Sequence, residues 1–303
     1  MARHFLGFSD WSGAELAAIL DLADELKRAR RAGEPRRHLE GRTLAMLFEK
    51  SSTRTRVSFE AGMTELGGHA IMLSPRDTQI GRGEPIRDTA RVLSRYVDAI
   101  MVRTYGQDVV EELARWSSVP VVNGLTDLLH PCQLMADLMT ARERLGNLNN
   151  LKVAWIGDGN NMARSWIEAQ AAFGFELTLA CPRDYRVDEG FIASRRRGGP
   201  RVEVVESPLE AAAGANVVTT DVWASMGQEE EVGKRQRDFA AFTVDGRVMG
   251  AARPGAIFLH CLPAYRGKEV SEEVLEGAQS AVWDEAENRL HVQKAILVTL
   301  LKA

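Results

Sequence analysis

The chain alternates short apolar runs with longer stretches of helical spacing, and it does so in two successive series. A run such as Thr43–Phe48 predicts a buried strand, and the stretch after it predicts a helix that crosses to the next strand. Such crossovers place neighbouring strands parallel and cover both faces of the sheet with helices. We therefore predict an α/β fold with two doubly wound parallel-sheet domains joined by interdomain helices. The expected strands are residues 43–48, 70–73, 99–103 and 119–122, then 153–156, 177–180, 202–205, 217–220, 257–261 and 281–283.

Two predicted helices set the domain boundaries. Cys132–Leu145 has helical spacing between the two series and is expected to join the domains. The 303 residues are enough for two domains, here 1–145 and 146–287. The last helix, 288–303, is apolar nearly all round, so we expect it to pack back onto the first domain.

Charge, hydropathy and cysteine content exclude several classes of protein. Lys and Arg total 38 and Asp and Glu total 42, and the net charge of −4 argues against nucleic acid as the main partner. No apolar run approaches the ~20 residues of a membrane span, and no charged-then-apolar leader opens the chain. We therefore expect a soluble, cytoplasmic protein with no membrane partner. The cysteines, Cys132, Cys181 and Cys261, are too few and too scattered for a disulfide framework or a CxxC metal site.

The segment that follows the first predicted strand, Glu49–Arg56, has the composition of an anion-binding site. Serine and threonine at a helix start cap free backbone N–H groups, and the same N–H groups attract anions. Arg54 and Arg56 add planar cations suited to phosphate or carboxylate. The alternative is an ordinary helix cap with solvated arginines. The absence of a GxxxxGK[ST] motif argues against nucleotide phosphate bound in the manner of a P-loop.

Five motifs, in order along the chain, resemble those of the aspartate/ornithine carbamoyltransferase family. FEKSSTRTRVSFE resembles the family's carbamoyl-phosphate signature, HPCQ resembles its HPxQ motif, and GDGNN resembles the segment that carries its amino-acid-binding asparagine. DVWASMG and HCLP match motifs of the ornithine branch. The motifs occupy residues 48–60, 130–133, 157–161, 221–227 and 260–263, and the resemblance runs from about Phe5 to the last helix.

This resemblance implies transfer of a carbamoyl group from carbamoyl phosphate to the δ-amine of L-ornithine, giving L-citrulline and phosphate. Such an enzyme of arginine biosynthesis needs no metal and no organic cofactor, because phosphate is already a good leaving group. Its expected partners are the two small-molecule substrates, and the expected assembly is a homotrimer or a multiple of trimers. Putrescine or an N-acylated ornithine stays open as the acceptor. Aspartate is disfavoured because its side-chain carboxylate would require a basic pocket.

The resemblance also implies a set of residues that bind carbamoyl phosphate. Arg103 is expected to reach the phosphate and the carbonyl oxygen, and His130 to donate a hydrogen bond to that oxygen and so stabilise developing negative charge. Gln133 is expected to bind the carbamoyl amide, and Gln79 to reach the phosphate of a neighbouring subunit. The implied set is Ser52, Thr53, Arg54, Thr55, Gln79, Arg103, His130, Gln133, Cys261, Leu262 and Arg289.

The implied ornithine-binding residues are Asn161, Asp221, Ser225 and Met226. Asp221 supplies negative charge for an ammonium group, although a carboxylate at a strand end is often only a cap. An alkyl amine is almost wholly protonated at neutral pH, and removing its proton costs about 4.6 kcal/mol. Cys261 is therefore interpreted as a proton acceptor or an amine-orienting group, although a buried thiol is otherwise inert core. The implied catalytic set is Cys261, Arg103, His130 and Asp221.

Two other classes of protein compete with this interpretation. The GDG sequence after a predicted strand resembles part of a dinucleotide-binding motif, but Met162 stands where the third glycine belongs. A non-catalytic binder on the same fold has no need for both a thiol and an imidazole in these motifs. Tyr265 and Arg164 depart from the His and Asn that are common in the family, and both bear on acceptor preference.

Overall fold

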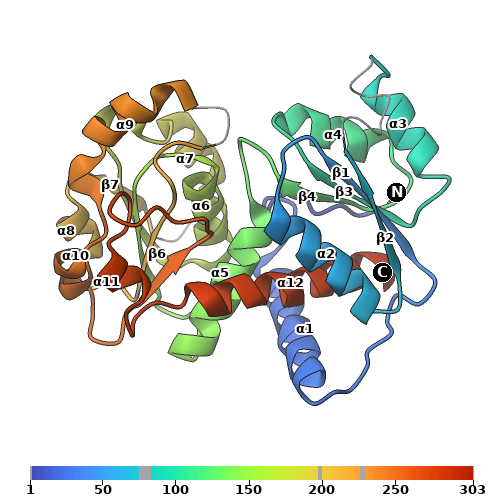
Figure 1. Ribbon diagram of the computed structural model, residues 1–303, viewed down its shortest axis with the longest axis horizontal. Helices are drawn as coiled ribbons and strands as arrows, with labels where there is room; N and C mark the ends of the chain where they lie inside the picture. The colour runs from blue at the N-terminus through green and yellow to red at the C-terminus, as the bar shows by residue number, and fades with distance from the viewer. Residues whose placement is uncertain (1, 75–82, 197–199, 226–228, 303) are drawn as a thin grey trace. The chain divides into compact units, whose positions relative to one another are not determined.

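The computed structural model describes residues 2–74, 83–196, 200–225 and 229–302 (Figure 1). The chain divides into two compact units: unit 1 is Met1–Ala136 with Glu287–Ala303, and unit 2 is Asp137–Ala286. The divisions fall inside helices α5 (Pro131–Leu145) and α12 (Val282–Lys302). The boundary expected from sequence, after residue 145, coincides with the end of α5.

Unit 1 contains a four-stranded sheet of β1 (Thr43–Phe48), β2 (His69–Leu73), β3 (Ala99–Arg103) and β4 (Val121–Leu125). The strands lie in the order β2-β1-β3-β4, and all of them are parallel. The central strand β1 is buried along nearly its whole length, as expected for a parallel strand with helices on both faces. The other helices of unit 1 are α1 (Gly13–Arg31), α2 (Thr53–Glu65), α3 (Ile86–Leu93) and α4 (Gln107–Trp116).

The alternation of β1 side chains builds the core on both faces of this sheet. Ala45 and Leu47 pack in one cluster with apolar side chains of α3 and α4. Leu44 and Met46 are also buried and point to the opposite face, because successive side chains of a strand alternate. The C-terminal part of α12 lies against α2, where Lys294 pairs with Glu65 at 2.6 Å.

Unit 2 contains a five-stranded parallel sheet in the order β7-β6-β5-β8-β9. Its core includes alternate residues of β5 together with Trp223 and Phe239, whose rings stack with centroids 5.9 Å apart. The strands are β5 (Lys152–Ile156), β6 (Glu176–Ala180), β7 (Val202–Val205), β8 (Val217–Thr220) and β9 (Ile257–His260). The helices are α6 (Asn161–Phe173), α7 (Glu189–Arg195), α8 (Pro208–Ala212), α9 (Val232–Asp238), α10 (Gly246–Ala251) and α11 (Glu272–Leu275).

The predicted fold class is confirmed, since both sheets are wholly parallel and carry helical crossovers. The strand expected at residues 281–283 is wrong. Val282 instead begins α12, and Asp284 and Glu285 in its first turn favour a helix N-terminus. Among the described residues, no helix has both the length and the apolar composition that crossing a membrane requires.

Each sheet has one point where the strand order reverses direction. In unit 1 the chain passes from β1 to β2 on one side and later to β3 on the other, and ligands of open parallel sheets generally bind beside the loops that follow two such strands. In unit 2 the loops after β5 and β8 have the same relation. The sheet order therefore predicts that ligand-binding residues directly follow these four strands.

Candidate active site

In unit 1, the loop after β1 leads directly into the N-terminus of α2. Ser52 is the N-cap of α2, and its Oγ accepts a hydrogen bond from the Thr55 amide at 3.2 Å. The capping residue is extended while Thr53 and the residues after it are helical, so the first free N–H groups of the helix point outward at this end. This arrangement favours an anion, because those N–H groups and the helix dipole both attract negative charge.

Two buried arginines converge on the hydroxyl of Thr55. Arg103, at the end of β3, donates to Thr55 Oγ1 at 3.4 Å, and Arg289, in α12, donates to the same oxygen at 2.7 Å. Ser52 Oγ also donates to it, at 3.1 Å. Three donors thus share one neutral oxygen. An anionic oxygen is the stronger acceptor for guanidinium groups, so these donors suit a phosphate or carboxylate ligand better than a hydroxyl.

His130 and Gln133, at the start of α5, lie in the same cluster. The Gln133 side-chain oxygen accepts from Arg289 Nη1, and His130 Nε2 lies 3.5 Å from the same nitrogen. Burial lowers the pKa of His130 well below its usual value, and the positive charges of Arg289, Arg103 and Arg54 lower it further. His130 is therefore a neutral imidazole at physiological pH, and the field around it is positive.

We call these groups the anion cradle. It combines a helix N-terminus, three guanidinium groups, a neutral imidazole and a side-chain amide, most of them buried. Such a set can bind a phosphate group and polarise a neighbouring carbonyl. Gln79 lies outside the described residues. The anion cradle consists of Ser52, Thr53, Arg54, Thr55, Arg103, His130, Gln133 and Arg289.

Sequence reasoning missed two charged residues beside the cradle, Glu49 and Lys50. The Lys50 ammonium pairs with Asp127, after β4, and lies 4.2 Å from the centre of the Tyr105 ring. Glu49 accepts a hydrogen bond from Thr104, after β3. These contacts connect the loops after β1, β3 and β4, which carry the cradle residues. The sequence could have indicated these two residues, because both directly follow a predicted strand.

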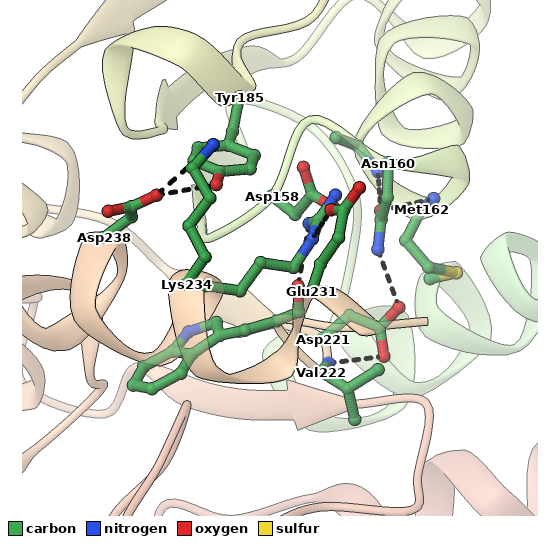
Figure 2. A network of polar contacts seen from close by, with 12 residues as sticks. Asp158, Asn160, Met162, Tyr185, Asp221, Val222, Glu231, Lys234 and Asp238 are labelled. Carbon is green, nitrogen blue, oxygen red and sulfur yellow. Dashed lines mark hydrogen bonds and ion pairs between the residues drawn. The ribbon is translucent and has the colours of Figure 1, made fainter. Parts of the chain in front are cut away.

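In unit 2, three side chains from separate loops meet at the ends of β5, β8 and β9. Asn160 Nδ2 donates to Asp221 Oδ2 at 2.9 Å, and Cys261 Sγ donates to Asp221 Oδ1 at 3.2 Å (Figure 2 shows the Asn160–Asp221 contact). The backbone N–H of Val222 also donates to Asp221 Oδ1, at 2.8 Å. We call Asn160, Asp221 and Cys261 the acceptor cluster. A carboxylate that accepts hydrogen bonds from neutral donors can attract a cationic amine.

The state of the Cys261 thiol limits its chemistry. Removal from water raises the pKa of this thiol well above its usual value, and the charges of Asp221, Glu285 and Asp137 raise it further. The group is therefore a neutral thiol that donates to Asp221. Of the two roles left open by the sequence, this favours orienting an amine over accepting its proton. Structurally, Cys261 and Leu262 belong to unit 2 and lie with Asp221.

The His260 imidazole stabilises the Cys261–Leu262 segment through a hydrogen bond to its backbone. Its Nδ1 accepts from the Leu262 amide at 2.9 Å, and its Nε2 faces Glu269 at 3.3 Å, so the ring proton belongs on Nε2. Leu262 has a φ of +58°, a left-handed conformation that costs a branched side chain about 1–2 kcal/mol. Asp221, His260 and Cys261 bring three ligand atoms within 4.8 Å of one another, but these hydrogen bonds already use both imidazole nitrogens.

The remaining predicted acceptor residues lie near this cluster along the chain. Asn161 is the first residue of α6, next to the N-cap Asn160, and Ser225 is half-buried in the segment after β8. Met226 lies outside the described residues. The guanidinium carbon of Arg164 lies 6.0 Å from the centre of the Phe191 ring, and the side chain of Tyr265 is half exposed. Asn160 itself was not predicted, although it is adjacent to a predicted residue.

The GDG sequence has a packing explanation. Gly157 has a φ of +141°, which strongly favours glycine. At Gly159 a Cβ would lie 2.5 Å from the Val187 nitrogen and 2.6 Å from the Tyr185 oxygen. The backbone path of the loop therefore requires both glycines. Since the GDG sequence was the only motif that suggested a dinucleotide-binding site, that alternative is no longer supported.

Comparison with known proteins gives the same family over both units. Residues 3–143 match the family model described as "Aspartate/ornithine carbamoyltransferase, carbamoyl-P binding domain", and residues 149–300 match "Aspartate/ornithine carbamoyltransferase, Asp/Orn binding domain". The chain is 56% identical to an ornithine carbamoyltransferase of Pelobacter propionicus over 99% of each chain, and 54% identical to that of Geobacter sulfurreducens over 100% of each. Its fold is similar to the ornithine carbamoyltransferase structure from Pyrococcus furiosus, with a TM-score of 0.94, 48% identity, and coverage of 98% and 96%.

Proposed function

Because the chain belongs to the aspartate/ornithine carbamoyltransferase family, we propose that it transfers the carbamoyl group of carbamoyl phosphate to the δ-amine of L-ornithine, giving L-citrulline and phosphate. The observation that carries this proposal is full-length similarity above 50% identity to enzymes named for that reaction. The opposite electrostatic character of the two units supports it, since one substrate is an anion and the other carries an amine.

The anion cradle is proposed to bind carbamoyl phosphate. The N-terminus of α2, with Ser52–Thr55, would hold the phosphate, while Arg103 and neutral His130 would donate to the carbonyl oxygen. Negative charge grows on that oxygen when the amine nitrogen attacks the carbonyl carbon, and preset donors lower the barrier by stabilising it. The C–O bond to phosphate then breaks, and phosphate leaves with the electron pair. Gln133 would bind the carbamoyl amide, and Arg289 would neutralise further charge.

The acceptor cluster is proposed to bind ornithine, together with Asn161, Ser225 and Met226. Asp221 would attract and orient an ammonium group, and the neutral thiol of Cys261 would fix the carboxylate through their hydrogen bond. The attacking amine must lose one proton in the reaction, and a nearby carboxylate can accept it. Leu262 would contribute a backbone contact.

The finer biological setting follows from the same assignment. We propose a cytoplasmic enzyme of arginine biosynthesis that assembles as a homotrimer, with Gln79 reaching the phosphate bound by a neighbouring subunit. Light scattering after size-exclusion chromatography tests the assembly. The expected mass is three times the 33.5 kDa of one chain, or a multiple of that.

A panel of acceptors tests the reaction itself. The enzyme is incubated with carbamoyl phosphate and, separately, ornithine, putrescine, N-acetylornithine or aspartate, and both phosphate release and the carbamoylated product are measured. Ornithine is expected to give the highest kcat/KM. Faster carbamoylation of putrescine or N-acetylornithine would overturn the substrate assignment, and phosphate release without any carbamoylated product would overturn the activity.

A further inference from the structure

A buried guanidinium group next to the acceptor cluster makes three directed hydrogen bonds. Arg235, in α9, is nearly buried, with a side-chain exposure of 8%. Its Nη1 donates to Asp158 Oδ2 at 2.7 Å and to the backbone oxygen of Trp223 at 2.8 Å, and its Nε donates to Glu231 at 2.8 Å. Figure 2 shows this network, with Asp158, Glu231 and Asp221 in view.

The bonds of Arg235 join two of the three loops that carry the acceptor cluster, those after β5 and β8. Asp158 lies in the loop after β5, two residues before Asn160. Trp223 lies in the segment after β8, two residues beyond Asp221. The loops therefore have two cross-links, the Asn160–Asp221 hydrogen bond at one place and the Arg235 bridge at the other.

The side chain of Trp223 also fixes the segment after β8. The Trp223 ring is buried and stacks on Phe239, just beyond the end of α9. With the ring in the core and the carbonyl bound by Arg235, Trp223 has little freedom to rotate. The orientation of Asp221, two residues earlier, follows from that anchoring.

We propose that Arg235 is a positioning residue for the acceptor: it sets the segment after β8 against the loop after β5 and so presents the Asp221 carboxylate to the amine. This inference rests on the proposed function. A planar fork with several fixed N–H directions is needed, because one cation must serve a carboxylate, a backbone carbonyl and a second carboxylate at once. A lysine ammonium carries the same positive charge but lacks the fixed N–H directions of the planar guanidinium group.

The test compares Arg235→Lys with the wild type and with a matched neighbour, Lys234→Ala. Lys234 is exposed, and its Nζ lies 3.9 Å from Asp238 and 5.4 Å from the centre of the Tyr185 ring. Among the described residues, it makes no hydrogen bond to Asp158, Trp223 or Glu231, the partners of Arg235. We expect Arg235→Lys to lower kcat/KM for ornithine about 10- to 100-fold, because an amine misplaced by a fraction of an ångström reacts much more slowly. The KM for carbamoyl phosphate is expected to stay within twofold of the wild type, and Lys234→Ala is expected to leave both quantities unchanged.

A double variant separates positioning from general support of the fold. If Arg235 acts through Asp221, then adding Arg235→Lys to Asp221→Asn should lower kcat/KM for ornithine less than twofold further, since coupled residues are not additive. Independent losses that multiply would overturn the proposal, as would equal losses for the two substrates.

Two further outcomes are distinguishable. A wild-type enzyme that carbamoylates no ornithine refutes the proposed function, whereas an active wild type with an unaffected Arg235→Lys refutes only this inference. Should Arg235→Lys fail to fold, Glu231→Gln gives the answer. It leaves the bonds to Asp158 and Trp223 in place but weakens the hold on the guanidinium, and a rise of about threefold in the KM for ornithine alone is expected; an unchanged KM would contradict the proposal.

Discussion

In unit 1, the loops at the reversal point of the sheet bring guanidinium groups and a helix N-terminus together, whereas in unit 2 the equivalent loops bring together one carboxylate and neutral donors. Burial lowers the pKa of His130 and the positive charges of unit 1 lower it further, while burial raises the pKa of Cys261 and the negative charges of unit 2 raise it further. The same topology therefore produces two sites of opposite charge. Parallel sheets fix where side chains converge, and the loop residues decide what binds there.

The comparison also shows two ways to keep a reactive-looking residue neutral. Both side chains stay neutral because burial disfavours their charged forms. Neighbouring charges add to this, since charged His130 would be a cation among cations and charged Cys261 an anion among anions. Both groups are therefore hydrogen-bond donors near neutral pH. This is the state that orientation of a substrate requires, and it differs from the state of a nucleophile.

The largest expected effect is that of Asp221→Asn. This change removes the charge of the acceptor cluster and leaves the donors Asn160 and Cys261 with a weaker partner. We expect kcat/KM for ornithine to fall about 100- to 1,000-fold, as for loss of one partner of a close charged pair. The KM for carbamoyl phosphate should be nearly unchanged. Steady-state kinetics with each substrate varied in turn measures both.

A control for Asp221→Asn is available in the same unit. Asp245 is the N-cap of α10 and accepts hydrogen bonds from Arg247 and Val248. Asp245→Asn should leave the kinetics unchanged, because asparagine also caps helices well. If Asp221→Asn weakened carbamoyl phosphate as much as ornithine, the assignment of opposite charges to the two substrates would be wrong.

Arg54→Ala should act on the other substrate. Arg54 belongs to the first turn of α2 and contributes to the positive field at His130. Loss of a charge-assisted hydrogen bond to phosphate costs about 1.5–3 kcal/mol, so we expect the KM for carbamoyl phosphate to rise about 10- to 100-fold. The midpoint of thermal unfolding should stay close to that of the wild type.

Arg56→Ala is the matched control for this variant. Arg56 lies two residues further along α2, is half exposed, and pairs with Glu60 at 2.9 Å. An exposed pair of this kind contributes less than about 1 kcal/mol, and the KM for carbamoyl phosphate should not change. Equal effects of the two substitutions, or unfolding of Arg54→Ala, would contradict the specific role of Arg54.

A smaller effect is expected for Cys261→Ser. A serine hydroxyl can still donate to Asp221, so kcat should fall about tenfold or less. The pH–rate profile of kcat should keep its shape, because the raised pKa of Cys261 leaves the thiol neutral across the profile. A loss above about 1,000-fold, or disappearance of an ionisation from the profile, would restore the thiol as a proton acceptor.

Residue patterns predicted some parts of this molecule and not others, for physical reasons. The family resemblance assigned the roles of Arg103 and His130, while the local hydrophobic pattern placed Arg103 at the end of a strand. Arg289 was assigned by resemblance alone, and its contact with Thr55 joins residues 234 positions apart, which no local pattern reports. Arg235 carried no signal, since its partners are set by tertiary packing of α9.

One error, at residues 281–283, and one omission, Asn160, have equally local causes. Residues 281–283 form an apolar run too short to separate a strand from the start of a helix. Asn160 and Asn161 differ by one position, but the first is the N-cap and the second lies inside the helix. That one-residue shift rotates a side chain by about 100° around the helix axis, and the pattern alone did not indicate that Asn160 contacts Asp221.

The smallest expected effect is on the pH dependence of stability, and it tests the neutral state of buried His130 without any substrate. The pKa of His130 is lowered in the folded protein, so between that value and about 6.5 the unfolded state binds one more proton than the folded state. Stability is therefore fully present above about pH 6.5 and falls as the pH drops below it, by up to about 1.4 kcal/mol per pH unit for each such histidine. His291, buried near Lys294 and Lys27 with its pKa lowered to about 3, adds a second contribution of the same sign.

His130→Gln removes the first contribution and leaves that of His291, together with those of His4 and His38, whose pKa values are also lowered by burial. Urea unfolding at a series of pH values from 7 to 5 should show a slope against pH that is shallower by up to about 1.4 kcal/mol per unit than that of the wild type. The carboxylates Glu65 and Asp245, whose pKa values are lowered, act only at more acidic pH and do not interfere in this range. An unchanged slope would mean that the pKa of His130 is not lowered in the folded protein, and the neutral state assigned to this imidazole would then be wrong.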